Sequence, residues 1–154
     1  MNGDLEVLTL ILNEAPYGDE KVWNALRLAR ALTSAKIGMK VNIYLLGDAV
    51  NLAKKGQRTP GGYYNLEKML RELVEQGVEV MACSMCLDAR GLTEEDLIES
   101  VEPGSTMLLA WWLKESQGVL SQKPGDQGED WRCQRRGHGV QQPGGSSLRP
   151  GLSR

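Results

Sequence analysis

Three short apolar segments, separated by segments with helical periodicity, constrain the fold of this chain most strongly. The segments are residues 7–12 (VLTLIL), 41–46 (VNIYLL) and 78–82 (VEVMA). Mainly apolar runs of strand length are typical of strands that are covered on both faces. The two intervening stretches carry apolar side chains three and four residues apart, as amphipathic helices do. This alternation predicts an α/β fold with a mainly parallel sheet and helices on both faces.

The second half of the folded part is less regular. We expect short helices at residues 49–55 and 93–100, the second because Thr93 and Asp96 have the spacing of a capping box. Residues 107–113 have the length of a strand, but their apolar side chains continue a helical period, so we predict a helix. Trp111 lies off its apolar stripe, which indicates an exposed side chain or an oligomer contact. A last strand should begin at residues 119–120.

The composition of the chain changes near residue 120. Residues 121–154 contain seven Gly and three Pro, and neither a helical nor a strand period continues there. We therefore predict one α/β domain at residues 1–120 and a low-complexity tail at 121–154 that is disordered or non-native. The tail holds six Lys or Arg against three Asp or Glu, but these charges are dispersed and Trp131 is its only aromatic residue. This pattern argues against a nucleic-acid-binding arm.

Charge and hydropathy exclude several classes of protein. The net charge of −2 gives no reason to expect a nucleic-acid or membrane partner. No apolar run approaches the ~20 residues that a membrane-spanning helix needs. The first residues lack the features of a secretory signal, and three cysteines do not suggest a disulfide framework. We therefore expect a cytoplasmic protein in reducing surroundings.

The sequence CSMCLDARG at residues 83–91 follows directly on the third predicted strand. In open α/β sheets, ligands and chemistry are found at the carboxyl ends of strands. A following helical turn and the nearby cation Arg90 would favour the thiolate form of Cys83, which is the nucleophilic form. Cys83 is therefore a candidate to accept and pass on a sulfur atom. Cys86 could resolve a persulfide on Cys83 or form a disulfide with it.

Other interpretations of the two thiols remain open. Free cysteines are often simply buried structural residues. A thioredoxin-like dithiol needs a long helix directly after the motif, which residues 88–91 disfavour. A zinc site needs two more ligands, and the soft candidates, Cys133 and His138, lie in the tail. We expect no metal and no cofactor. His138 is the single histidine, so the folded part lacks a Cys–His pair.

Four motifs together resemble the DsrE/DsrF-like sulfur-relay family, in its small YchN-like branch. They are LNEAPYG at residues 12–18, LGDAV at 46–50, GQRTPGGYYN at 56–65 and CSMCLDARG at 83–91. The resemblance covers about residues 5–120. Members of the family usually end with a short strand of the form Val-Leu-Thr-Phe, which this chain begins at residues 119–120 before it diverges.

The resemblance implies a flavodoxin-like three-layer subunit that assembles into homo-trimers or homo-hexamers. It also implies an intracellular sulfur relay in which Cys83 carries sulfane sulfur as a persulfide from a donor protein to an acceptor protein. The role of Cys86, and whether the protein turns over as a sulfurtransferase enzyme, stay open. Two other hypotheses are kept: a non-catalytic oligomeric module that binds a small ligand or partner, and a dithiol redox switch.

Overall fold

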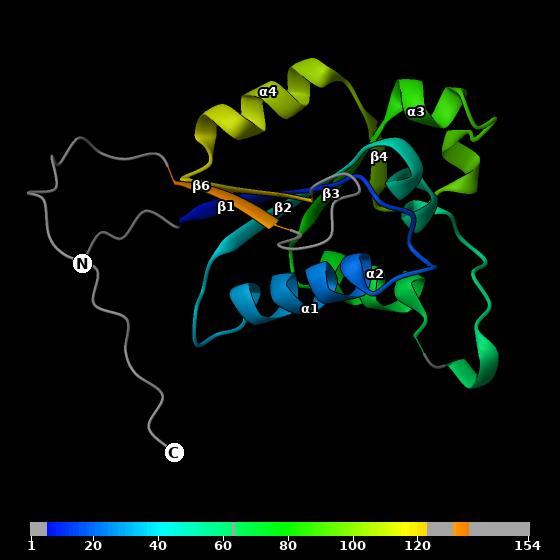
Figure 1. Ribbon diagram of the computed structural model, residues 1–154, viewed down its shortest axis with the longest axis horizontal. Coiled ribbons are helices and arrows are strands. Elements are labelled where there is room, and N and C mark those ends of the chain that lie inside the picture. Colours follow the sequence, from blue (N-terminus) through cyan, green and yellow to red (C-terminus); the bar gives the residue numbers. More distant parts are fainter. Residues whose placement is uncertain (1–5, 63, 123–130, 136–154) are drawn as a thin grey trace, which may run out of the picture.

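The chain folds around a single six-stranded sheet, which confirms the predicted α/β class (Figure 1). The computed structural model describes residues 6–62, 64–122 and 131–135. The strand order is β4-β3-β2-β1-β5-β6. Five neighbouring strands run parallel: β1 (Val7–Leu12), β2 (Lys40–Leu45), β3 (Glu79–Cys83), β4 (Val101–Gly104) and β5 (Gly118–Gln122). The sixth, β6 (Trp131–Arg135), is antiparallel to β5.

Helices cover both faces of the sheet, which gives the three layers of a flavodoxin-like fold (Figure 1). On one face lie α1 (Lys21–Thr33) and α2 (Leu66–Glu75), and on the other lie α4 (Thr106–Glu115) and the short helix α3 (Ser84–Asp88). Both long helices of the first face bury one apolar stripe, as their periodicity predicts. Asn65 caps α2, since its side chain accepts a hydrogen bond from the Lys68 N–H.

The central strands β1, β2 and β3 contribute buried side chains to the hydrophobic core, beside those of the covering helices. In β1, the side chains of Leu8, Leu10 and Leu12 are buried on the face toward α1 and α2, and Thr9 is buried on the face toward α4. The Thr9 hydroxyl lies 2.5 Å from the hydroxyl of Ser116, the residue that ends α4. This pairing satisfies two polar groups inside the sheet–helix interface, as buried polar atoms require.

The segment between the third strand and α4 differs from its prediction. The predicted capping box at Thr93 and Asp96 is present, but the helix after it is only a 3-10 turn, η3 (Glu94–Asp96). Residues 101–104, for which no strand was predicted, form β4. This strand has four residues, includes Pro103 and pairs with β3 alone, so it is too short to show a strand period.

Two further segments also adopt 3-10 geometry. The helix expected at residues 49–55 is the 3-10 helix η1 (Gly47–Ala53), and η2 (Pro60–Gly62) lies in the loop before α2. The helix predicted at residues 107–113 is confirmed as α4, and the last strand is confirmed as β5.

Within residues 121–154, the structure describes residues 121–122, which end β5, and residues 131–135. Residues 131–135 form β6, with Gly118 opposite Arg135 and Gln122 opposite Trp131, and so depart from the disorder expected for residues 121–154. Pairing with the open side of β5 satisfies backbone hydrogen bonds, a long-range gain that composition does not reveal. Residues 123–130 and 136–154, which include His138, lie outside the described residues. Among the helices of the described residues, none has the length and apolar character that crossing a bilayer requires.

Candidate functional site

The two cysteines of the CSMC motif lie together at the carboxyl ends of the parallel strands. Cys83 is the last residue of β3, and α3 begins at the next residue, so Cys86 sits on the first turns of that helix. Both cysteines are free thiols. The turn after β2 reaches the same place. This is the location that the strand-then-loop pattern predicts.

Cys83 is a buried thiol, with only 7% of its surface exposed. Burial raises the pKa of Cys83, and a side-chain hydrogen bond with Cys86 raises it further, while the backbone N–H groups of Cys86 and Met85 act in the opposite direction. The net shift is upward. The predicted acidification of Cys83 is therefore wrong for this subunit: desolvation outweighs the first turn of a helix that is only five residues long.

Cys86 is half-buried, and its sulfur is held by the turn that follows β2. The backbone N–H of Gly47 donates a hydrogen bond to the Cys86 Sγ over 3.2 Å. Gly47 has a φ of 54°, in the left-handed region that residues with a side chain enter only at a cost. A glycine at this position therefore lets the turn aim its N–H at the second thiol.

Arg90 does not act on Cys83 in the way that its position in the motif suggests. Its Nε and Nη2 both donate to the Asp48 Oδ1, over 3.0 and 2.7 Å, and its Nη1 donates to the Cys86 carbonyl over 3.0 Å. The guanidinium charge is thus balanced by a carboxylate. Arg90 ties the end of α3 to the turn after β2, and so positions the loop that carries the thiols.

Tyr44 is a residue of this site that the sequence analysis missed. Its side chain is fully buried on β2, and its ring meets the ring of Trp112 edge to face, with centroids 6.1 Å apart. Burial raises the pKa of Tyr44 to about 12, with Cys83 and then Cys86 adding to the shift. The phenol therefore keeps its proton at neutral pH, close to both thiols. The available signal is a lone hydroxyl-bearing aromatic in the apolar run at residues 41–46.

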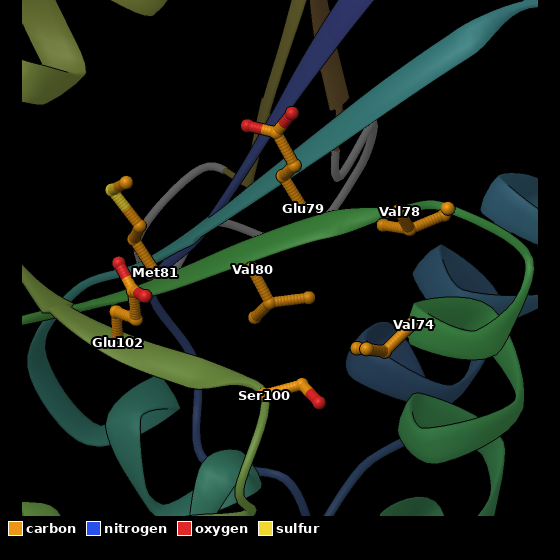
Figure 2. A pocket seen from close by; sticks show the side chains of 8 residues that line it. Val74, Val78, Glu79, Val80, Met81, Ser100 and Glu102 are labelled. Carbon is orange, nitrogen blue, oxygen red and sulfur yellow. The ribbon is translucent and has the colours of Figure 1, made fainter.

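Two hollows lie apart from the thiols. The first, of about 350 Å³, runs along β3 and β4, and Glu79 and Glu102 are among its lining residues (Figure 2). The second, of about 400 Å³, is lined by the aromatic side chains of Tyr17, Trp23 and Tyr64. Neither is lined by a cysteine. Within the described ranges, no group of three or more His, Cys, Asp or Glu side chains is arranged to hold a metal ion.

An apolar surface on α3 and α4 flanks the thiol loop. Both helices lie on the same face of the sheet (Figure 1). Met85 is 76% exposed, and Met107 and Trp111 are 68% and 51% exposed. Leu108 is exposed beside them. Exposed large apolar side chains on neighbouring elements often mark an interaction site.

Comparison with known proteins gives a consistent result. The DsrE/DsrF-like family matches residues 6–121. The protein YchN of Escherichia coli is 38% identical over 117 residues, which are 76% of this chain and 99% of YchN. An uncharacterised protein of Methanopyrus kandleri is 46% identical over 116 residues, which are 75% of this chain and 93% of that protein.

A solved structure and a more distant sequence relative point to the same family. The crystal structure of the Escherichia coli YchN protein superposes with a TM-score of 0.71, at 37% identity, and covers 76% of this chain and 99% of that chain. The intracellular sulfur oxidation protein DsrF of Allochromatium vinosum is a more distant relative. It is 35% identical over 88 residues, which are 56% of this chain and 63% of DsrF.

Proposed function

The chain belongs to the DsrE/DsrF-like family, and we propose that it is a sulfur-relay protein that carries sulfane sulfur as a persulfide on Cys83. Membership of this family, with DsrF as a distant relative, supports a sulfur-relay-like role. The observation that carries the finer proposal is the pair of free thiols packed together at the end of β3. A thiol at this position is the one strong nucleophile of the site.

The transfer step needs no oxidant. A donor persulfide R–S–SH reacts with the Cys83 thiol to give Cys83–S–SH and R–SH. The sulfur of Cys83 attacks the outer sulfur of the donor as a thiolate, the S–S bond of the donor breaks, and the proton of Cys83 ends on the departing R–S⁻. The reverse reaction with an acceptor thiol delivers the sulfur, so the protein acts once per encounter as a carrier.

The raised pKa of Cys83 gives this step a physical requirement. A buried neutral thiol reacts slowly, because only the thiolate is nucleophilic. It also resists oxidation and exchange with small thiols between deliveries. Sulfur transfer to the isolated protein should therefore be slow, and a partner that brings positive charge or opens the loop at the moment of contact would accelerate it.

Cys86 allows a second reaction of the persulfide on Cys83. Its side chain already hydrogen-bonds Cys83. Attack of the Cys86 thiolate on the inner sulfur of Cys83–S–SH would form a Cys83–Cys86 disulfide and release the outer sulfur as hydrosulfide. This reaction would empty the carrier without an acceptor protein.

The partners of the proposed carrier are further copies of this chain and two other proteins. The apolar surface of Met85, Met107, Leu108 and Trp111 supports assembly into a homo-oligomer, either a trimer or a hexamer. A protein donor and a protein acceptor of sulfane sulfur would each have to reach Cys83 from the carboxyl ends of the strands.

Mass spectrometry tests the proposal directly. The protein is treated with inorganic polysulfide, and the wild type is compared with Cys83→Ser and Cys86→Ser. We expect one added, reducible sulfur atom that maps to Cys83 and is absent from Cys83→Ser. Sulfur that still adds to Cys83→Ser, or thiols that react only after unfolding, would reject the carrier.

One observation favours a second candidate. Cys83 is buried, and the two hollows described above are not lined by either thiol. A non-catalytic oligomeric module that binds a small ligand or partner would have these properties. Native thiols that do not react with either polysulfide or iodoacetamide would support this candidate over the carrier.

A further inference from the structure

The hydroxyl of Tyr44 is a buried hydrogen-bond donor that lacks a partner in the part of the chain that the structure describes. Tyr44 is fully buried, so its hydroxyl does not form a hydrogen bond with water at the protein surface. Buried polar groups in folded proteins are nearly always paired, because an unpaired one loses its hydrogen bonds to water without replacement. A phenylalanine would fill the same space without this cost. The unpaired hydroxyl therefore calls for an explanation.

The ring of Tyr44 crosses the strand that carries Cys83. Tyr44 lies opposite Met81 of β3, and Cys83 is two residues further along the same face. Cys83 in turn lies opposite Gly104 of β4. A Cβ added at Gly104 would lie 3.0 Å from the Tyr44 Cε2, an atom next to the carbon that bears the hydroxyl. The ring thus reaches from β2 over β3 to Gly104 of β4, on the face of the sheet that carries Cys83.

The surroundings hold the ring in this position. Trp112 of α4 packs its ring at 90° to that of Tyr44. Gly104 leaves room for the ring because it has no side chain. The phenol also keeps its proton, since burial and the neighbouring thiols raise the pKa of Tyr44 to about 12. The hydroxyl is therefore a protonated donor, held within electrostatic reach of both thiols.

We propose that the Tyr44 hydroxyl donates a hydrogen bond to the sulfane sulfur that Cys83 carries, and so stabilises the loaded form of the protein. This inference rests on the proposed carrier function. Loading lengthens the Cys83 side chain by one S–S bond of about 2 Å, which extends it toward new partners. The outer sulfur of a persulfide is the end that carries the negative charge, and anionic acceptors form the stronger hydrogen bonds.

No covalent bond of Tyr44 changes in this proposal. The hydroxyl keeps its proton in the empty and in the loaded protein, and the hydrogen bond forms only in the loaded one. The hydrogen bond shifts the sulfur-exchange equilibrium toward loaded Cys83, because the Tyr44 hydroxyl stabilises the loaded protein and not the empty one. The Tyr44 hydroxyl thus lacks a hydrogen-bond partner in the empty protein and gains one in the loaded protein.

The test compares the full-length wild type with Tyr44→Phe and with the matched control Tyr17→Phe. The Tyr17 hydroxyl bonds to Gln57 and Leu66 in a surface loop, away from the thiols. Each protein is equilibrated with glutathione and glutathione persulfide, and the ratio of loaded to empty Cys83 is measured by intact mass spectrometry. Loss of a hydrogen bond to a charged group should lower this ratio roughly ten-fold or more in Tyr44→Phe, with Tyr17→Phe unchanged.

A spectroscopic readout separates this role from a structural one. In wild type labelled with ¹³C at the tyrosine Cζ, the Tyr44 resonance is assigned by its loss in Tyr44→Phe. If Tyr44→Phe does not fold, the Tyr44 resonance is assigned by elimination, as the signal that Tyr17→Phe, Tyr63→Phe and Tyr64→Phe each retain. The resonance should shift when Cys83 is loaded. Equal loading of wild type and Tyr44→Phe, or a Tyr44 resonance that does not shift on loading, would overturn the proposed role of Tyr44 and leave the carrier function in place. Wild type that takes no sulfur at Cys83 would overturn the carrier function, and this inference with it.

Discussion

Replacing Gly104 with alanine should destabilise the fold by forcing the Tyr44 ring away from its place beside Cys83. The new Cβ would lie 3.0 Å from the Tyr44 Cε2, 3.1 Å from the Met81 Cβ and 3.3 Å from the Met81 Sδ. All three distances are shorter than ordinary van der Waals contact. The Tyr44 ring cannot move aside freely, since Trp112 packs against it edge to face and its surface is fully buried.

The magnitude follows from two opposing effects. Inserting a methyl group into a packed core typically costs about 1–3 kcal/mol. Replacing glycine in a strand gains back about 0.5–1 kcal/mol, because alanine restricts the unfolded chain. We therefore expect Gly104→Ala to lower the free energy of unfolding by about 1–2 kcal/mol. Urea titration followed by circular dichroism measures this change as a lower midpoint at an unchanged slope.

Gly118→Ala is the matched control, since it places the same methyl group in another strand of the same sheet. Its Cβ would meet one atom closer than 3.0 Å, the Leu8 Cδ1 at 2.9 Å, and that atom is the end of a flexible side chain. We expect this variant to lie within about 0.5 kcal/mol of wild type. In a double-mutant cycle, Tyr44→Leu should remove much of the cost of Gly104→Ala. A Gly104→Ala protein as stable as wild type, or a cost that Tyr44→Leu does not change, would refute the reasoning.

Three further predictions address the thiols, the ion pair and the apolar surface. Because the pKa of Cys83 is raised, iodoacetamide should label Cys83 slowly at pH 7 and faster as the pH rises, and fast labelling at pH 7 would contradict the assignment. The same raised pKa means that the thiol contributes stability below the ordinary cysteine pKa and loses this contribution above it. Urea unfolding of wild type and Cys83→Ala across this pH range measures the loss. Asp48→Asn, which removes the charge partner of Arg90 at a largely exposed position, should cost less than about 1 kcal/mol in urea unfolding, and a larger loss would show that the pair does more than tie two loops together. Trp111→Glu should lower the mass of the assembly in sedimentation equilibrium if α4 joins copies of this chain, and an unchanged mass would place the interface elsewhere.

The sequence predicts those parts of the fold in which the spacing of apolar residues along the chain matches the side chains that are buried. The apolar run of β1 is buried, and the stripes of α1 and α2 face the sheet. In α4, the helical period correctly separates the buried Trp112 from the exposed Trp111, although the segment also has the length of a strand. These predictions succeed because each depends on residues within a few positions of one another.

The parts that the sequence does not predict depend on contacts between distant residues. The strands β4 and β6 have only four and five residues and lie at the two edges of the sheet, where each forms by pairing with a strand from another part of the chain. Arg90 and Asp48 are 42 residues apart, and no local signal shows that the cation is already paired. The pKa of Cys83 likewise depends on how deeply the folded chain buries its sulfur, which the motif alone does not contain.

The central position of β1 has a consequence for how this chain folds during synthesis. One neighbour of β1 is β2, which follows it closely along the chain, but the other is β5, more than 100 residues later, with Leu8 opposite Gly118. Pairing over such separations is slow, because a long loop must close first. While the ribosome is still making residues 46–117, β1 therefore presents a row of unpaired N–H and C=O groups to other nascent chains. Chains that end before β5 should for this reason form aggregates, even though they contain both thiols.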